Sequence, residues 1–222
     1  MTDDRTTTFQ RARSAEQREI RKQTILDAAT QLLDEMPVGE ISLRELSRRV
    51  GLSKTNVVRY FETREAVFFE LLNRSLAQWT EDLADQLPAA GTAASHDAVT
   101  AVVAESLAGR PLLCGLLSAL GPELERNISA QAARDFKLAH VRLLGELAAL
   151  LQRRLTGLTA AQARELVSLT VVYTAGLWPF AHPSEAVSEA LEDPELAGTK
   201  VDFAARLGRT LQVTVAGLLS SA

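Results

Sequence analysis

The segment from Ile41 to Phe61, ISLRELSRRVGLSKTNVVRYF, constrains the fold of this chain more than any other feature. Ser42 is followed three residues later by Glu45, a pattern that favours the start of a helix through a capping box. Gly51 can take the left-handed conformation that commonly ends a helix, and Ser53 can cap a second helix directly after it. The segment therefore predicts two short helices joined by a tight turn, which is a helix-turn-helix.

Positive charge is concentrated on this segment although the whole chain is acidic, with a net charge of -4. Six basic residues against Glu45 and Glu62 give residues 41–64 a net charge of +4. In a helix-turn-helix the second helix enters the major groove of DNA, and basic side chains around it bind phosphates. We therefore expect a DNA-binding segment; a solvated hairpin within a helical bundle is the alternative. The basic residues are Arg44, Arg48, Arg49, Lys54, Arg59 and Arg64.

Composition predicts an all-α protein, because 46% of the residues are hydrophobic, only 5% are aromatic, and the apolar residues recur at helical spacing. The single cysteine, Cys114, excludes an internal disulfide and is typical of a cytoplasmic protein. Its apolar surroundings, PLLCGLL, favour a buried thiol over a nucleophile. No apolar run is long enough to span a bilayer, and the N-terminus lacks a signal-peptide core. We expect no membrane partner.

Apolar periodicity and helix-breaking residues predict ten helices. Pro179 and Pro183 are expected to break the chain, as are Gly121 and Pro122. Besides the two helices of the motif, the expected ranges are 15–36, 64–86, 95–108, 111–120, 128–155, 159–178, 184–191 and 202–219. The last but one of these is short.

The pattern predicts three parts. Residues 1–18 are polar and read as a mobile arm. Residues 19–79 form a DNA-binding domain whose helix-turn-helix motif covers residues 42–61. Residues 80–222 form an all-helical domain for ligand binding and dimerisation. The boundary is expected near Trp79, within the long helix 64–86.

Two of the predicted helices are apolar on nearly all sides, namely residues 166–178 and 203–219. A helix without a polar face must be covered all round. A two-fold homodimer would cover both helices by pairing them into a four-helix bundle. The alternative is that both are central core helices of one subunit.

Residues Ile25 to Leu72 resemble the TetR family of bacterial transcriptional regulators. The matching pieces are ILDAATQLL, then SLRELSRRVGLSKTNVVRYF, then TREAVFFELL, and the resemblance covers roughly residues 19–79. It implies a three-helix DNA-binding head, an all-helical regulatory domain, a homodimer, and release from DNA when a small molecule binds. Members of this family are usually repressors.

The resemblance assigns roles within the motif. Ser53 would cap the recognition helix and contact a phosphate, with Lys54 at the start of that helix, and Thr55 and Asn56 in base-reading positions. Arg59 would lie one turn further on. The remaining implied DNA contacts are Tyr60, at a position touching the backbone, and Arg64, at a position often held by a phosphate-binding Lys; Arg44 belongs to the same basic surface. Val58 departs from the family, in which Tyr is common, and suggests an apolar contact or packing instead.

The chemistry of two of these side chains supports base reading independently. Asn56 can bond adenine through two hydrogen bonds, and Arg59 can do the same with guanine. Contact with phosphates is the alternative for both.

Catalytic, metal and cofactor sites are not expected. His96, His140 and His182 are far apart in the sequence, and no HExxH, GxSxG or Gly-rich phosphate loop is present. Candidates for contact with a small-molecule ligand are a histidine on the apolar side of its helix and four aromatic residues, with core packing as the alternative for each. They are Trp79, Phe136, His140, Tyr173 and Trp178.

These observations favour a dimeric, ligand-responsive repressor that binds a near-palindromic operator in double-stranded DNA. An activator, a helical scaffold protein without DNA binding, and an enzyme are the alternatives.

Overall fold

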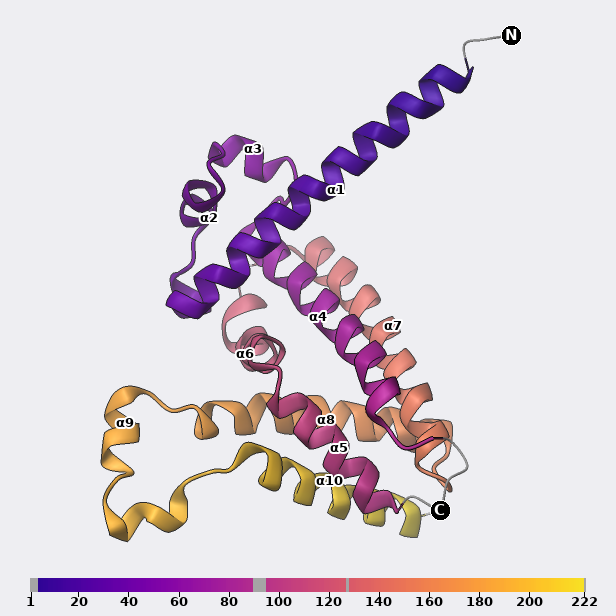
Figure 1. The fold of residues 1–222 in the computed structure, drawn as a ribbon, viewed down its shortest axis with the longest axis vertical. Helices are drawn as coiled ribbons and strands as arrows, with labels where there is room; N and C mark the ends of the chain where they lie inside the picture. Colours follow the sequence, from indigo (N-terminus) through magenta and orange to yellow (C-terminus); the bar gives the residue numbers. More distant parts are fainter. Residues whose placement is uncertain (1–3, 90–94, 127, 222) are drawn as a thin grey trace. The chain divides into compact units, whose positions relative to one another are not determined.

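The computed structural model describes residues 4–89, 95–126 and 128–221, with side chains from Ala15 onward (Figure 1). Its described residues form helices and connecting turns, which confirms the all-α prediction. The chain divides into two compact units, Met1–Leu71 and Leu72–Ala222. This division lies within the long helix α4 (Arg64–Gln86), earlier than the boundary expected near Trp79.

The first unit contains α1 (Asp4–Glu35), the 3-10 turn η1 (Val38–Glu40), α2 (Leu43–Val50), α3 (Lys54–Val58) and the start of α4. Helix α2 contacts both α1 and α3. Apolar side chains from every helix meet in one core, because the apolar stripe of α1 faces the motif. Its fully buried members include Ile25, Ala29, Leu32, Ile41, Leu46, Val57, Val67 and Phe68.

Helix α1 begins at Asp4, eleven residues before the start predicted from periodicity. The expected arm over residues 1–18 is therefore helical from Asp4 onward, and residues 1–3 lie outside the described part. The sequence from Asp4 to Ser14, DRTTTFQRARS, has almost no apolar residues. Periodicity detects the buried face of a helix, so it cannot detect a polar extension.

The predicted caps of the motif are confirmed, with one exception. The Ser42 hydroxyl accepts a hydrogen bond from the Glu45 backbone N–H at 3.1 Å, and Gly51 has φ of +66°. The Ser53 hydroxyl accepts one from the Asn56 N–H at 3.2 Å. However, the Glu45 carboxylate pairs with Arg48 instead of reaching back to the cap. The predicted return bond from the Glu45 side chain to the cap is therefore wrong, because the basic side chain of Arg48, three residues further on, competes for the carboxylate.

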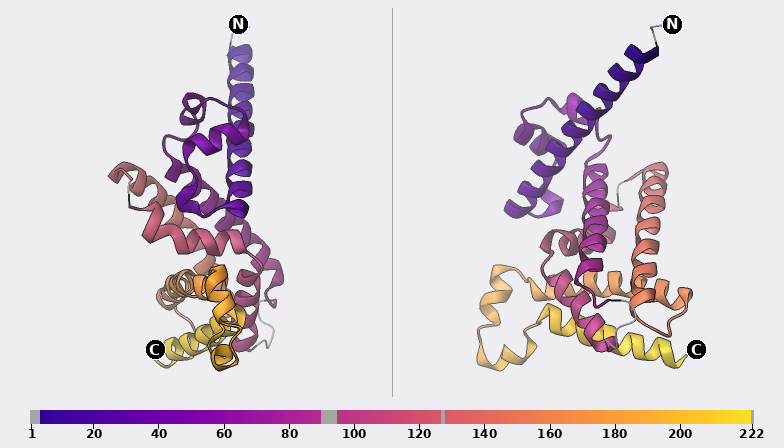
Figure 2. Two further views of the ribbon diagram at one scale, coloured as in Figure 1. Left: turned by 90° about the vertical axis from the view of Figure 1, so that its left-hand side faces the viewer. Right: turned by 45° about the vertical axis from the view of Figure 1, so that its right-hand side comes forward.

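The second unit contains the rest of α4 and six further α-helices, drawn from two sides in Figure 2. Helix α8 contacts α6, α7 and α10, and α10 also packs along α5. The bounds are α5 (His96–Ala108), α6 (Pro111–Ala119), the π-helical turn η2 (Leu120–Leu124), α7 (Ala130–Arg154), α8 (Ala160–Ala181), α9 (Glu185–Ala190), the 3-10 turn η3 (Pro194–Thr199) and α10 (Phe203–Ser220).

Two proline positions predicted to break the chain lie inside helical turns. Helix α8 includes Pro179 and runs to Ala181. Pro179 removes one backbone donor, but the helix still closes through the His182 N–H, which donates to the Trp178 carbonyl at 3.0 Å. Pro122 lies in η2, where the wider turn is closed by a hydrogen bond from the Glu125 N–H to the Leu120 carbonyl at 2.9 Å.

In the described residues, no single helix is long and apolar enough to cross a membrane. By length and composition alone, α5 and residues Pro111–Leu124 would suffice only as a pair, and that pair is bent by 85°.

Candidate DNA-binding surface and ligand-binding core

Helix α3 presents three successive polar side chains at the surface of the first unit. Lys54, Thr55 and Asn56 are exposed, whereas Val57 is fully buried and anchors the helix. The Ser53 hydroxyl is used in capping α3, as predicted. Val58 is 40% exposed, so it is available for an apolar contact and does not pack in the core.

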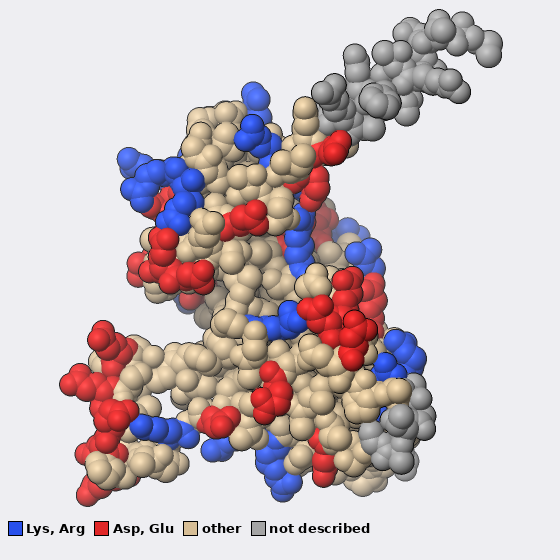
Figure 3. Space-filling model, viewed as in Figure 1, with Lys and Arg blue, Asp and Glu red and all other residues tan. Residues whose placement is uncertain are grey.

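The basic residues of the motif fall into two groups, and Figure 3 shows Lys and Arg side chains gathered over part of this unit. Arg48 pairs with Glu45. The Arg49 guanidinium binds both Glu35 carboxylate oxygens, at 2.9 and 2.5 Å. This hydrogen bonding lowers the pKa of Glu35 below its ordinary value. These two ion pairs neutralise part of the local positive charge of the motif.

The second group is free to meet an anion. Within the described part of the chain, the side chains of Arg44, Lys54 and Arg59 make no hydrogen bond or ion pair, and all three residues are exposed. Unpaired cations at an exposed surface are the groups that bind phosphates with the smallest desolvation cost.

Arg64 opens α4, as the resemblance implies, and its side chain makes several contacts within the first unit. Its side chain is only 19% exposed, and its Nε lies 3.2 Å from the Glu65 carboxylate. One terminal nitrogen donates to the Gly39 carbonyl at 3.1 Å, and the guanidinium lies over the Phe68 ring. Arg64 therefore connects the start of α4 to η1, and a phosphate contact would compete with these interactions.

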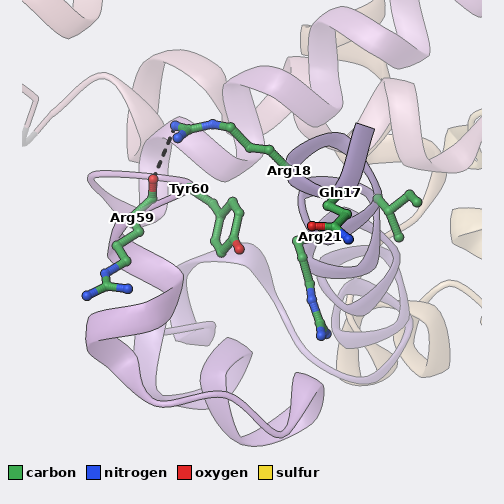
Figure 4. A pocket seen from close by; sticks show the side chains of 6 residues that line it. Gln17, Arg18, Arg21, Arg59 and Tyr60 are labelled. Atoms are coloured by element: carbon green, nitrogen blue, oxygen red, sulfur yellow. Dashed lines mark hydrogen bonds between the residues drawn. The ribbon is translucent and has the colours of Figure 1, made fainter. Parts of the chain in front are cut away.

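Arg59 and Tyr60 lie at the end of α3, about one turn on from Thr55 and Asn56. Arg59 is the C-terminal capping residue of α3. Both line an open cleft of about 590 Å³, seen from close by in Figure 4, together with side chains from α1. The α1 residues are Gln17, Arg18, Ile20 and Arg21. Sequence reasoning missed Arg18 and Arg21, because nothing in their local pattern links them to a motif some forty residues away.

Three of the ligand candidates are buried in the second unit with their polar atoms satisfied. Trp79 is 2% exposed, and its indole N–H donates to the Ser106 hydroxyl at 2.9 Å. His140 stacks on Phe136 at 5.1 Å between ring centroids, and its Nδ1–H donates to the Asn73 side-chain oxygen at 2.9 Å. Burial, reinforced by Lys137, lowers the pKa of His140. The arrangement is that of a hydrogen-bonded core histidine.

The other two candidates lie on α8. Trp178 is 9% exposed. It stacks on His182 at 3.7 Å and meets the edge of Phe203 at 5.0 Å. Tyr173 is half-buried. Between them, Thr174 is fully buried, and its hydroxyl has no hydrogen-bond partner in the described residues.

A small enclosed cavity lies in the core of the second unit. Its volume is about 10 Å³, which is roughly the space needed for one water molecule. A metabolite would therefore have to displace the side chains that line it, which are Val99, Thr100, Val103, Leu151, Leu155, Leu166, Thr170 and Leu211.

Cys114 is a buried, unreactive thiol, as predicted. It is fully buried, and its Sγ–H donates to the Leu107 carbonyl at 3.3 Å. Burial raises its pKa to about 12, so the thiolate is absent near neutral pH. Among the residues described, no group of three His, Cys, Asp or Glu side chains could hold a metal ion.

The helices predicted to form a dimer interface each leave large apolar side chains exposed, among exposed polar residues. Val172 and Phe180 on α8 are 60% and 70% exposed, and Val213 on α10 is 55% exposed. Their opposite faces form the core of the second unit, where Leu211 is 1% exposed. Each is therefore a core helix of the subunit on one side.

Comparison with known proteins places both units in one family. Residues 25–71 match the model for bacterial regulatory proteins of the tetR family. Residues 73–222 match the model for the tetracyclin repressor-like C-terminal domain. No curated protein matches the chain.

Solved structures share the fold at low sequence identity. The TetR family repressor AlkX from Dietzia sp., implicated in n-alkane biodegradation, is 17% identical with a TM-score of 0.55, over 90% of this chain and 95% of that one. The fatty acid degradation regulator FadR from Bacillus halodurans is 14% identical with a TM-score of 0.56, over 89% and 95%. FadR from Bacillus subtilis, solved with stearoyl-CoA, is 16% identical with a TM-score of 0.53, over 88% and 98%.

The two family matches together cover nearly the whole described chain and agree with the capped helix-turn-helix and the helical second unit. Regulators of this family act by binding DNA and are not enzymes. This chain belongs to the TetR family and is a DNA-binding transcriptional regulator.

Proposed function

We propose that this regulator is a repressor that binds a near-palindromic operator as a homodimer and leaves it when a small apolar molecule binds. The observation that carries the proposal is the exposed polar face of α3 beside unpaired cations. It acts where the chromosome lies, in the cytoplasm.

Base reading falls to the exposed residues of α3. Asn56 is exposed on the first turn of the helix, and its amide matches the donor and acceptor that adenine presents in the major groove. Thr55 can meet a thymine methyl group. Lys54 and Arg44 supply charge for the phosphates on either side, and this charge contributes affinity without sequence preference.

Dimerisation through α8 and α10 is supported by their outward faces. Val172, Phe180 and Val213 are large apolar side chains left exposed by a single subunit. A two-fold axis would bring each face against its copy and remove these side chains from water. It would also repeat α3 in two half-sites one helical turn apart, or a multiple of it, which demands a palindromic operator.

An apolar effector is supported by the core of the second unit. The buried polar side chains described there are Thr100, His140, Thr170 and Thr174, and the first three are already hydrogen-bonded. A ligand entering this core can gain mainly apolar contacts, with the Thr174 hydroxyl as a free polar partner. The stearoyl-CoA complex of a relative with the same fold makes acyl chains the first class to test.

Coupling between effector and DNA is assigned to α4, because this one helix contributes residues to both units. An effector that prefers the released state shifts the helix and changes the distance between the two recognition helices. Coupling of about 1–3 kcal/mol would be ordinary, and it must be reciprocal.

The function is tested by selecting bound DNA from random sequence with the purified full chain. We expect a palindromic site that is released by long-chain acyl compounds and represses a reporter in cells. Failure to select any sequence would favour the scaffold alternative, and higher reporter expression on binding would show an activator.

Reciprocity is then measured by calorimetry with the releasing compound, with and without the selected DNA. The compound must bind more weakly to the DNA complex, by the factor by which it weakens DNA binding. Equal affinity in the two titrations would exclude allosteric release.

A further inference from the structure

The cleft beside the end of α3 gathers three arginine side chains that sequence reasoning did not connect. Its lining residues come from two segments of the chain, and Figure 4 shows them on α1 and at the end of α3. They are Gln17, Arg18, Ile20, Arg21, Arg59 and Tyr60.

One of the arginines is held in place by the protein. Arg18 donates to the Arg59 backbone carbonyl at 3.2 Å, and its guanidinium lies 5.9 Å from the centre of the Tyr60 ring. An arginine has five N–H donors, so one hydrogen bond leaves Arg18 with donors for a further partner. The contact also ties α1 to the end of the recognition helix.

The described lining of the cleft carries positive charge without a compensating carboxylate. The side chains of Arg21 and Arg59 make no hydrogen bond or ion pair with any described residue, and no carboxylate is among the described residues that line the cleft. An anion bound in the cleft would be attracted by all three guanidinium groups. The planar fork of arginine fits the oxygens of a phosphate.

We propose that Arg18, Arg21, Arg59 and Tyr60 form a binding site for one phosphodiester of the DNA backbone, at the edge of each half-site. The inference rests on the proposed function of α3. It assigns Arg59 to phosphate binding instead of base reading, and it adds α1 to the DNA interface.

Position and chemistry both favour backbone DNA as the occupant. Arg59 directly follows α3, three residues after Asn56, so the cleft borders the helix that enters the major groove. The walls of that groove are rows of phosphates. Ile20 is an apolar lining residue that is 58% exposed, and it is suited to contact a deoxyribose next to the bound phosphate, as the Tyr60 hydroxyl is suited to donate to it.

The first experiment measures the salt dependence of DNA binding. The full chain, Arg21→Ala and Arg18→Ala are titrated with selected operator DNA between 50 and 200 mM salt. Each lost phosphate contact lowers the slope of log affinity against log salt by about 0.9, so a dimer loses about 1.8. Arg142→Ala, an exposed arginine on α7, is the matched control and should keep the wild-type slope.

The second experiment locates the phosphate. Single phosphates of the operator are replaced by neutral methylphosphonates. The affinity of the wild type should fall when the replaced phosphate is the one bound in the cleft, at one position in each half-site. The affinity of Arg21→Ala should not change with replacement at that position. Arg59→Ala should weaken all sequences equally, whereas Asn56→Ala should relax preference at one base.

The outcomes separate this inference from the function on which it rests. If wild type binds its operator but Arg21→Ala and Arg18→Ala keep the wild-type slope and the same methylphosphonate sensitivity, the site is overturned while the function stands. Relaxed base preference in Arg59→Ala would also overturn it. If wild type selects no DNA, the proposed function itself fails. Binding of inorganic phosphate without any change in slope would make the cleft a site for a free anion, which also overturns the inference.

Discussion

In the first unit the polar side chains proposed to bind a ligand lie at the surface, whereas in the second unit they are buried. Asn56, Arg21 and Arg59 are exposed, and their side chains make no hydrogen bond or ion pair with any described residue. His140 is buried and bonded to Asn73, and Thr174 is buried without a partner.

This difference reflects the two kinds of ligand. DNA is a large polyanion that stays outside the protein, so its site is a surface of unpaired donors. A small apolar effector has to enter the protein, so its site competes with the packing of a core. A surface site can be recognised from a short motif, whereas a core site depends on which helices meet.

The largest expected effect separates the two faces of α10. Leu211→Glu would bury a carboxylate inside the subunit and unfold the second unit, because Leu211 is 1% exposed. Val213→Glu should leave the subunit folded but split the dimer, lowering operator affinity about 1,000-fold or more, towards the non-specific level. Circular dichroism and sedimentation distinguish the two variants.

The matched control for that pair is Val141→Glu on α7, since Val141 is 64% exposed and lies outside the proposed interface. It should remain a folded dimer. A dimeric Val213→Glu protein would show that α10 does not form the interface.

The next effect tests the surface of the first unit. Asn56→Ala should weaken operator binding by about 1–3 kcal/mol per half-site and relax preference at one base position. Thermal stability should stay unchanged, because the side chain is exposed. The measurement is the affinity for a set of operators that each differ at one base pair. An equal loss of affinity for all of them would show that Asn56 contacts the DNA backbone and does not read a base.

A smaller effect is expected at Arg64, for which the family implies a phosphate contact and the structure shows contacts within the protein. Arg64→Met should destabilise the first unit by about 1–3 kcal/mol, because it removes a charged donor from the Gly39 carbonyl. The salt slope of DNA binding should stay near the wild-type value. Denaturant unfolding and salt titration are measured together, and an unchanged stability with a lower slope would restore the phosphate contact implied by the family.

The smallest effect concerns pH in the second unit. Burial lowers the pKa of His140 in the folded protein, so the unfolded state binds the proton more readily. Stability is therefore unaffected above the ordinary histidine pKa and falls as the pH drops below it. Unfolding between pH 7.5 and 5.5 measures this loss.

His140→Gln is the control, because its amide can still donate to Asn73. It should show a smaller loss over the same range. An equal loss in both proteins would assign the pH dependence to other groups.

Several features of the motif could be predicted because they depend on neighbouring residues. The caps at Ser42 and Ser53 and the left-handed Gly51 follow from local hydrogen bonding and backbone sterics, and the structure confirms them. The reciprocal bond of Glu45 could not be predicted, because Arg48 competes for the same carboxylate at similar distance.

The sequence by itself determined the all-α class, the motif and the buried thiol of Cys114, since periodicity, capping and apolar context act within a few residues. Tertiary structure alone decided that Arg18 meets Tyr60, that Arg64 turns to Gly39, and that Leu211 faces inward while Val213 faces out. The physical reason is that these contacts join residues distant in the chain, and their partners exist only once the helices have packed.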